Sequence, residues 1–228
     1  MTEARDEGNW ARPVEQLHVG DVGNEAPRGN VEGRKLNNPM HGFGQMWQKT
    51  YRVSIPDATP EEIVATWKDR FGEFWPKRSK FYAPPGGIAP GEVAVIAGGM
   101  GPTKMSSGVL VMYADDTSFS YITPEGHPFA AFITFSSHAE ENAPATAQVQ
   151  LLIRNNDPLY ELGFKVYTSR FEDKMWQHTL RSVAEAFGVV DADVETQVVC
   201  VDKKRQWDRF GNIYKNSALR TLLRRDRR

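Results

Sequence analysis

The sequence predicts an α+β fold in which an antiparallel β-sheet curves around a long C-terminal helix. Between residues 92 and 157, short apolar runs separated by turn residues indicate a series of strands. From Asp157 onward the apolar residues recur at intervals of three and four, which is typical of a helix. A helix with a wide aromatic face has to bury that face, and the sheet is the available surface.

A strand and a helix precede this series. Residues 48–55 alternate apolar and polar side chains and predict a strand. Thr59 and Glu62 then form a capping-box pair, with Pro60 at the first helical position. The apolar spacing that follows predicts one helix or two short helices over residues 60–75, with a break at Gly72.

The strand series continues to the predicted long helix. We expect strands at residues 92–99, 106–116, 118–123, 128–138 and 145–157. The last of these alternates between apolar residues and glutamines, so one face is buried and the other is wet. The helix over residues 158–187 is long, and we expect a break between Thr168 and Glu172. Residues 194–201 predict a final short strand.

The composition divides the chain into three parts. Residues 1–45 are rich in Gly, Asn, Pro and charge, and we expect an extended or disordered arm. Residues 46–202 form the predicted ligand-binding domain. Residues 203–228 form a basic amphipathic tail with ten Lys and Arg against two Asp, a local charge of +8, while the whole chain carries -1. The tail either packs on the domain or binds an anionic membrane surface or a protein partner, and we do not expect nucleic acid.

Several classes of protein are disfavoured by what the sequence lacks. It has one cysteine, so no intrachain disulfide can form, and we expect a cytoplasmic protein. The N-terminal residues have no secretory pattern, and no run of 18 apolar residues occurs. The five histidines have no metal-binding spacing, and the glycine-rich run 97–104 lacks a phosphate-loop ending. We therefore expect no metal and no other cofactor.

Three stretches resemble the helix-grip proteins of the SRPBCC superfamily, which includes START lipid-transfer domains, birch-pollen-allergen-like proteins and polyketide cyclases. YRVSIPDATPEEIVATW is similar to their opening strand and helix, and EDKMWQHTLRSVAEAFGV to their closing helix. GHPFAAFITF resembles a bacterial branch of uncharacterised function. The resemblance covers roughly residues 48–190 and implies a helix-grip fold. Its members range from carriers to cyclases, so fold does not choose the function.

A sheet wrapped around such a helix leaves a cavity that suits a small ligand. The strand alternation and the helical spacing predict which residues line this cavity. We assign no catalytic residue. The predicted ligand-binding residues are Trp75, Tyr113, Tyr121, His127, Phe135, Leu151 and Trp176.

His127 follows Gly126 and precedes Pro128, where a turn enters a strand. It is either a turn histidine bonded to nearby backbone or a group at the cavity mouth that contacts a ligand or moves a proton.

The sequence therefore predicts a protein that binds a small hydrophobic or lipid-like ligand in an internal cavity. Two alternatives remain open. One is an enzyme of the polyketide cyclase or aromatase type, with His127 and a tyrosine as the acid–base pair. The other is a structural or partner-binding module with a packed interior.

Overall fold

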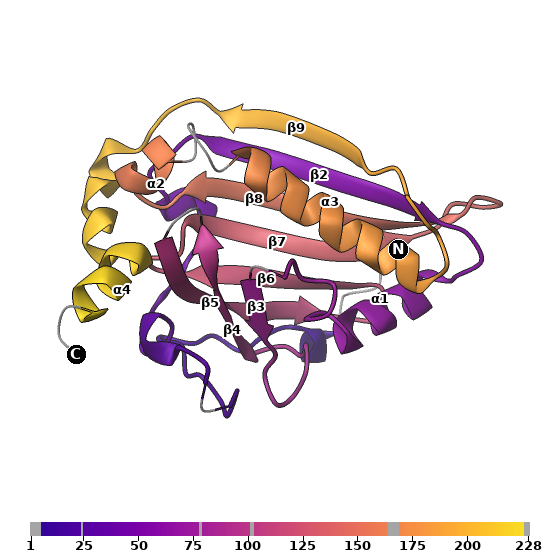
Figure 1. Cartoon of the computed structure of the whole chain (residues 1–228), viewed down its shortest axis with the longest axis horizontal. Helices are drawn as coiled ribbons and strands as arrows, with labels where there is room; N and C mark the ends of the chain where they lie inside the picture. Colours follow the sequence, from indigo (N-terminus) through magenta and orange to yellow (C-terminus); the bar gives the residue numbers. More distant parts are fainter. Residues whose placement is uncertain (1–5, 24, 78, 101–102, 164–168, 226–228) are drawn as a thin grey trace.

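The predicted α+β helix-grip fold is confirmed in the computed structural model, which describes residues 6–23, 25–77, 79–100, 103–163 and 169–225 (Figure 1). Within those ranges the strands form a nine-stranded antiparallel sheet, in the order β3-β4-β5-β6-β7-β8-β2-β9, with β1 paired to β6. The strands are β1 (Leu36–Asn37), β2 (Met46–Ile55), β3 (Ser79–Tyr82), β4 (Val93–Met100), β5 (Thr103–Ala114), β6 (Ser118–Pro124), β7 (Phe129–His138), β8 (Ala145–Asn155) and β9 (Glu195–Asp202).

Helix α1 (Pro60–Asp69) begins as the sequence predicts. The Thr59 hydroxyl accepts from the Glu62 N–H at 3.2 Å, and the Glu62 carboxylate accepts from the Thr59 N–H at 2.9 Å. The helix ends at Asp69, yet Phe71 and Trp75 beyond it are still buried. Strand β3 lies between the predicted helix over residues 60–75 and the predicted strand at 92–99, where we expect no strand.

The predicted long helix is two helices, α2 (Pro158–Gly163) and α3 (Ser169–Ala186). Asp157 caps the first of them, because its carboxylate accepts from the N–H groups of Leu159 and Tyr160. Residues 164–168, on which part of the predicted break falls, lie outside the described residues. Within the described ranges, the protein contains no helix with both the length and the apolar character needed to cross a membrane.

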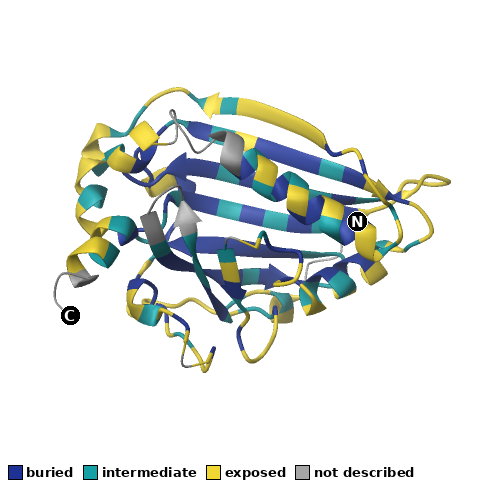
Figure 2. Cartoon of the chain, in the orientation of Figure 1, coloured by how far each residue is buried: buried dark blue, intermediate teal, exposed yellow. Residues whose placement is uncertain are grey.

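The main core lies between the concave face of the sheet and the helices. Helix α3 crosses β2 and β8, and α1 packs against β7 and β8 (Figure 1). Parts of α3 are buried (Figure 2). Trp176, Leu180 and Val183 are among its buried residues and belong to this core. This packing places α3 opposite the inward side chains of the central strands.

The N-terminal arm lies on the opposite, convex face of the sheet. In the described part of the arm, residues 6–23 and 25–45, the helical and strand segments are short 3₁₀ turns and β1. Leu17 and Val31 are nevertheless fully buried, and they form a second apolar cluster with outward residues of β4, β5 and β6. The arm therefore covers a face that would otherwise be exposed to solvent.

The C-terminal tail forms a 3₁₀ helix (Trp207–Lys215) and α4 (Ser217–Arg225). We call residues 215–217, where these two helices meet, the clasp. The Ser217 N–H donates to the Gly126 carbonyl at 3.0 Å, and the Asn216 side chain donates to the Asp157 carboxylate at 2.8 Å. Asn30 of the arm donates to the Ser217 carbonyl at 3.2 Å. The clasp thus joins the arm, the β6–β7 turn and the start of α2.

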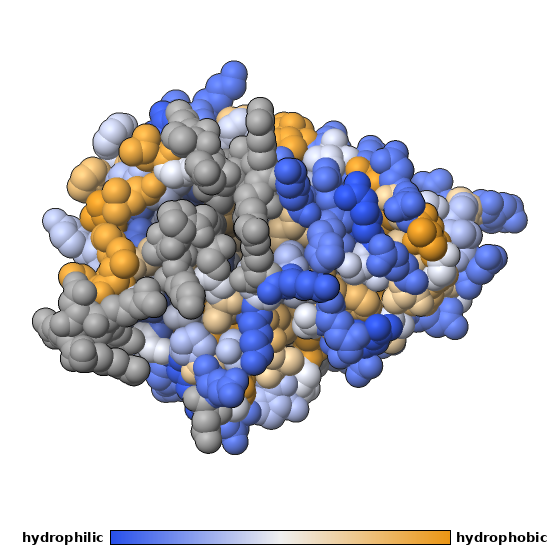
Figure 3. Space-filling model, in the orientation of Figure 1, coloured by the Kyte–Doolittle hydropathy of each residue, from blue (hydrophilic) through white to orange (hydrophobic). Residues whose placement is uncertain are grey.

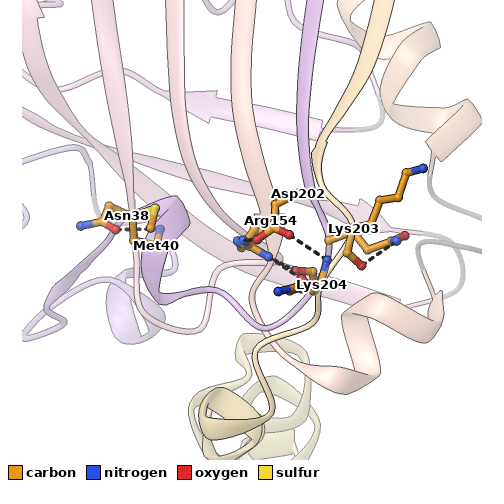
Figure 4. A network of polar contacts seen from close by, with 8 residues as sticks. Asn38, Met40, Arg154, Asp202, Lys203 and Lys204 are labelled. Atoms are coloured by element: carbon orange, nitrogen blue, oxygen red, sulfur yellow. Dashed lines mark hydrogen bonds and ion pairs between the residues drawn. The ribbon is translucent and has the colours of Figure 1, made fainter.

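A second junction forms around Arg154 at the end of β8, which is 1% exposed. Its guanidinium donates to the Gly44 carbonyl at 2.5 Å and to the Lys204 carbonyl at 2.9 Å, and it pairs with Asp202 (Figure 4). A buried arginine requires such partners, since an unpaired charge in the interior is strongly destabilising. Arg154 therefore fixes the start of the tail to the sheet.

Replacing Gly126 with alanine tests the clasp. Gly126 has φ +84°, and a Cβ there would collide with the Lys215 carbonyl oxygen, whereas Gly188 has φ +81° and open space around the Cβ position. We expect Gly188→Ala to lower the free energy of unfolding by about 1 to 2 kcal/mol through backbone strain alone. Gly126→Ala should cost about 1 to 3 kcal/mol more, because the clasp has to move. Urea unfolding measures both, and equal losses would contradict a tight clasp.

Candidate functional site

A cavity of about 120 Å³ lies between α3 and the concave face of the sheet. Its walls come from the segment after α1, from strands β3 to β8, and from the first half of α3. The residues that line it are Trp75, Ser79, Ile96, Gly98, Met105, Ser107, Val109, Tyr121, His127, Pro128, Phe129, Ala131, Ile133, Leu151, Ile153, Glu172, Met175 and Trp176. Most of the wall is apolar, so the cavity suits a ligand that is itself mainly apolar.

Five of the seven residues that the sequence predicts for this site meet in the cavity wall: Trp75, Tyr121, His127, Leu151 and Trp176. They come from four strands or turns and from α3, so only the fold brings them together. Tyr113 and Phe135 lie elsewhere.

Tyr113 lies on the convex face because a bulge interrupts β5. Val111 pairs with Tyr121, but Tyr113 pairs with Ser120, so one extra residue lies between the two pairs. The shift turns Tyr113 outward, where its ring contacts Trp10 of the arm at 4.7 Å and its hydroxyl donates to Asp115. Strict alternation, on which the prediction depended, fails at a bulge.

Phe135 faces inward, as predicted, but it lies behind the cavity wall. Its ring is 4.7 Å from that of Phe119, 5.2 Å from Phe71 and 5.3 Å from Trp67. It also contacts Trp176 at 5.8 Å. Phe135 therefore supports a wall residue rather than lining the cavity itself.

Several polar atoms of the wall have no hydrogen-bond partner among the described residues. They are the indole nitrogens of Trp75 and Trp176, the hydroxyls of Ser107 and Tyr121, and the Oε1 atom of Glu172. Buried polar groups are nearly always paired, because an unpaired one costs about 1 to 3 kcal/mol. Five such atoms lie around one cavity, where a bound molecule or water can complete their hydrogen bonds.

Glu172 belongs to a buried ion cluster that the sequence reasoning missed. Lys49 of β2 donates to Glu172 at 2.9 Å and to Asp173 at 2.8 Å, and the Tyr51 hydroxyl donates to Asp173 at 2.6 Å. Only the inward position of Lys49 in an otherwise apolar strand face signals this cluster in the sequence. It attaches the first turn of α3 to β2, beside the cavity.

The cluster changes the acidity of its members. Burial raises the pKa of the Glu172 carboxyl, and the Lys49 ammonium opposes that rise only in part. Burial would lower the pKa of Lys49, but the Glu172 and Asp173 carboxylates outweigh it and raise that pKa. The Trp176 indole also favours the charged form of Glu172, although the two groups do not form a hydrogen bond of ordinary geometry.

His127 bonds to nearby backbone, as one of the two alternatives expects, and it also lies in the cavity wall. Its Nδ1 atom lies 3.0 Å from the Phe129 nitrogen and 2.9 Å from the Phe129 carbonyl oxygen, so it accepts from the N–H in one tautomer and donates to the carbonyl in the other. The ring is half-buried and forms part of the cavity wall. Burial lowers the pKa of His127 to about 4, so the ring is neutral at pH 7.

The cavity contains groups that donate and accept hydrogen bonds, but it has no metal-binding character within the described residues. Across those residues, no three His, Cys, Asp or Glu side chains converge in a way that could hold a metal ion.

No protein-family model and no curated protein sequence matches the chain. Solved structures do match. A START superfamily protein from Mycobacterium smegmatis is 16% identical, with a TM-score of 0.45 over 63% of this chain and 99% of that one. The protein TTHA0849 from Thermus thermophilus is 15% identical, with a TM-score of 0.47 over 61% and 96%. Major latex-like protein 151 from Panax ginseng is 7% identical, with a TM-score of 0.45 over 63% and 99%. Similarities at these sequence identities and TM-scores concern only the path of the chain. They say nothing about a ligand or a reaction.

The lowered pKa of His127 predicts an acid-dependent loss of stability. Its folded pKa of about 4 lies below the unfolded value of 6.5, so the folded state resists protonation. The stability that this provides is complete above pH 6.5 and declines as the pH falls towards 4. His127→Asn keeps an acceptor for the Phe129 N–H but does not titrate. Between pH 7 and about pH 4.5, wild type should lose about 1 to 2 kcal/mol more than the variant in urea unfolding. If wild type and variant lose the same free energy of unfolding as the pH falls, His127 is not held neutral in the folded protein.

Proposed function

We propose that the protein binds a small, mainly apolar ligand non-covalently in the cavity between α3 and the sheet. The observation that supports this most directly is the combination of an apolar wall with five unpartnered polar atoms in one place. An apolar wall provides affinity through burial, and a few polar groups orient the ligand.

The size of the cavity limits the ligand. A volume of about 120 Å³ exceeds the room for two waters, since a water occupies about 30 Å³ of liquid. It is close to the 150 Å³ or so of an engineered cavity that binds benzene. Drug-sized ligands occupy pockets of about 300 to 1,000 Å³. A compound with one ring therefore fits this conformation, whereas a long acyl chain requires the cavity to widen.

The alternative of a cyclase-type enzyme has one observation in its favour, because His127 and Tyr121 both line the cavity. The pKa shifts of His127 and Tyr121 favour ligand binding over acid–base catalysis. Burial lowers the pKa of His127 to about 4, which makes it a weak base, and burial raises the pKa of Tyr121, so its hydroxyl keeps its proton.

Filling the cavity tests the proposal. Ala131 of β7 lines it, whereas Ala147 of β8 is equally buried but lies outside the wall. Toluene should bind the wild-type protein with one molecule per chain in calorimetry, and Ala131→Leu should abolish that binding. Ala147→Leu overpacks the core to a similar degree, at about 1 to 3 kcal/mol, but should leave toluene binding in place. Equal binding by all three proteins would place the ligand elsewhere.

We also propose that the C-terminal end of the molecule lies on an anionic membrane surface. Large apolar side chains are exposed there on α2, on the Trp207–Lys215 helix and on α4, and they gather at one end in Figure 3. Trp207 is 69% exposed and Tyr214 is 85% exposed. The same segment is strongly basic, and the combination of aromatic and basic residues is typical of peptides at lipid headgroups.

Liposome co-sedimentation tests this second proposal. The protein should bind vesicles that contain phosphatidylserine better than pure phosphatidylcholine vesicles, and high salt should reduce the difference by screening. A Trp207→Ala, Tyr214→Ala double variant should bind about tenfold less, because it loses apolar surface that enters the bilayer. Val190→Ala removes an equally exposed apolar side chain, 76% exposed, outside this region and serves as the control. Binding that depends on neither charge nor Trp207 would contradict the proposal.

A further inference from the structure

Glu172 has an oxygen atom that the ion cluster does not use. The side chain lies in the first turn of α3, is 3% exposed and lines the cavity. Its Oε2 atom accepts from Lys49 at 2.9 Å, whereas Oε1 has no hydrogen bond of ordinary geometry among the described residues. Burial raises the pKa of this carboxyl, and the neighbouring Trp176 indole opposes that rise without forming such a bond. A carboxylate oxygen of this kind is a strong acceptor in surroundings of low polarity.

The ion cluster does not need the Glu172 carboxylate in the cavity wall in order to neutralise Lys49. Lys49 already has a second carboxylate partner in Asp173, at 2.8 Å, and Asp173 also accepts from the Tyr51 hydroxyl. Among the described residues, the Lys49 ammonium is therefore shared by two carboxylates, of which Asp173 is 31% exposed to solvent and Glu172 only 3%. A buried carboxylate oxygen beside an apolar cavity is costly unless a donor reaches it.

The neighbouring groups identify the donor that fits. The indole N–H groups of Trp75 and Trp176 can only donate, and the Tyr121 hydroxyl can donate or accept. A ligand hydroxyl could donate to Glu172 and accept from one of these groups at the same time. A ligand cation would instead meet the Lys49 ammonium, which lies 2.9 Å from the same carboxylate. A neutral hydroxyl is therefore favoured over an amine.

We propose that the Oε1 atom of Glu172 accepts a hydrogen bond from the hydroxyl group of a small, neutral ring compound bound in the cavity. This inference rests on the proposed ligand-binding function and names the class of ligand, which is phenols and cyclic alcohols of about one ring. The apolar walls hold the ring, and Glu172 sets its orientation.

Phenol and toluene form a matched pair of probes, because they have the same shape and only phenol carries a hydroxyl. Both should bind the wild-type protein in calorimetry. In Glu172→Gln the carboxylate charge is lost, so the affinity for phenol should fall about tenfold, as expected for a hydrogen bond to a charged group. The affinity for toluene should stay within about twofold. Asp173→Asn removes the other carboxylate of the cluster and should leave phenol binding nearly unchanged.

A second variant covers the case in which Glu172→Gln does not fold. Glu172→Asp keeps the charge beside Lys49 but withdraws it from the cavity by one methylene, so phenol should again lose affinity and toluene should not. Equal changes for phenol and toluene, or no change for phenol, would overturn the role of Glu172 and leave the ligand-binding proposal intact. If neither probe binds the wild-type protein, the ligand-binding proposal fails, and the role of Glu172 fails with it.

Discussion

The packing of α3 across the concave face of the sheet determines where the other parts of this molecule lie. Its second half fills the space under the sheet with Leu180 and Val183, whereas its first turn is attached to β2 by Lys49. Between these two contacts the sheet and helix do not close completely, and the cavity is the result. The polar contact at the first turn of α3 and the apolar contacts of its second half thus hold the helix on the sheet, and the candidate site lies between them.

The periodic parts of the sequence predicted the central fold well. Alternation located β2 and β5 to β8, and the Thr59–Glu62 pair located the start of α1, because these patterns express local geometry. The short strand β3 escaped prediction because four residues between proline clusters carry too little alternation to recognise. The burial of the arm was missed for a different reason: Leu17 and Val31 are far in sequence from β4, β5 and β6, whose outward side chains bury them.

The candidate site was predictable only in part. Trp75, Tyr121, Leu151 and Trp176 follow from strand and helix faces, and all of them line the cavity. Tyr113 was misplaced by a bulge that no local pattern marks. Glu172 could not be recognised either, because an acidic residue at a helix start has an ordinary explanation in the helix dipole. Its significance depends on Lys49, which is 123 residues away in the sequence.

The contact between Asn30 and Ser217 has a consequence for the order in which the chain is completed. The two residues are 187 positions apart, so the arm leaves the ribosome long before its partner exists. The bonds from Asn30 to Ser217 and Thr221 can form only after a further 187 and 191 residues have been made. Contacts of such separation form slowly, because a long loop must close before they contribute. The arm is therefore made long before this contact fixes it in place, and a ribosome that stops short of Ser217 releases a chain whose arm lacks this attachment.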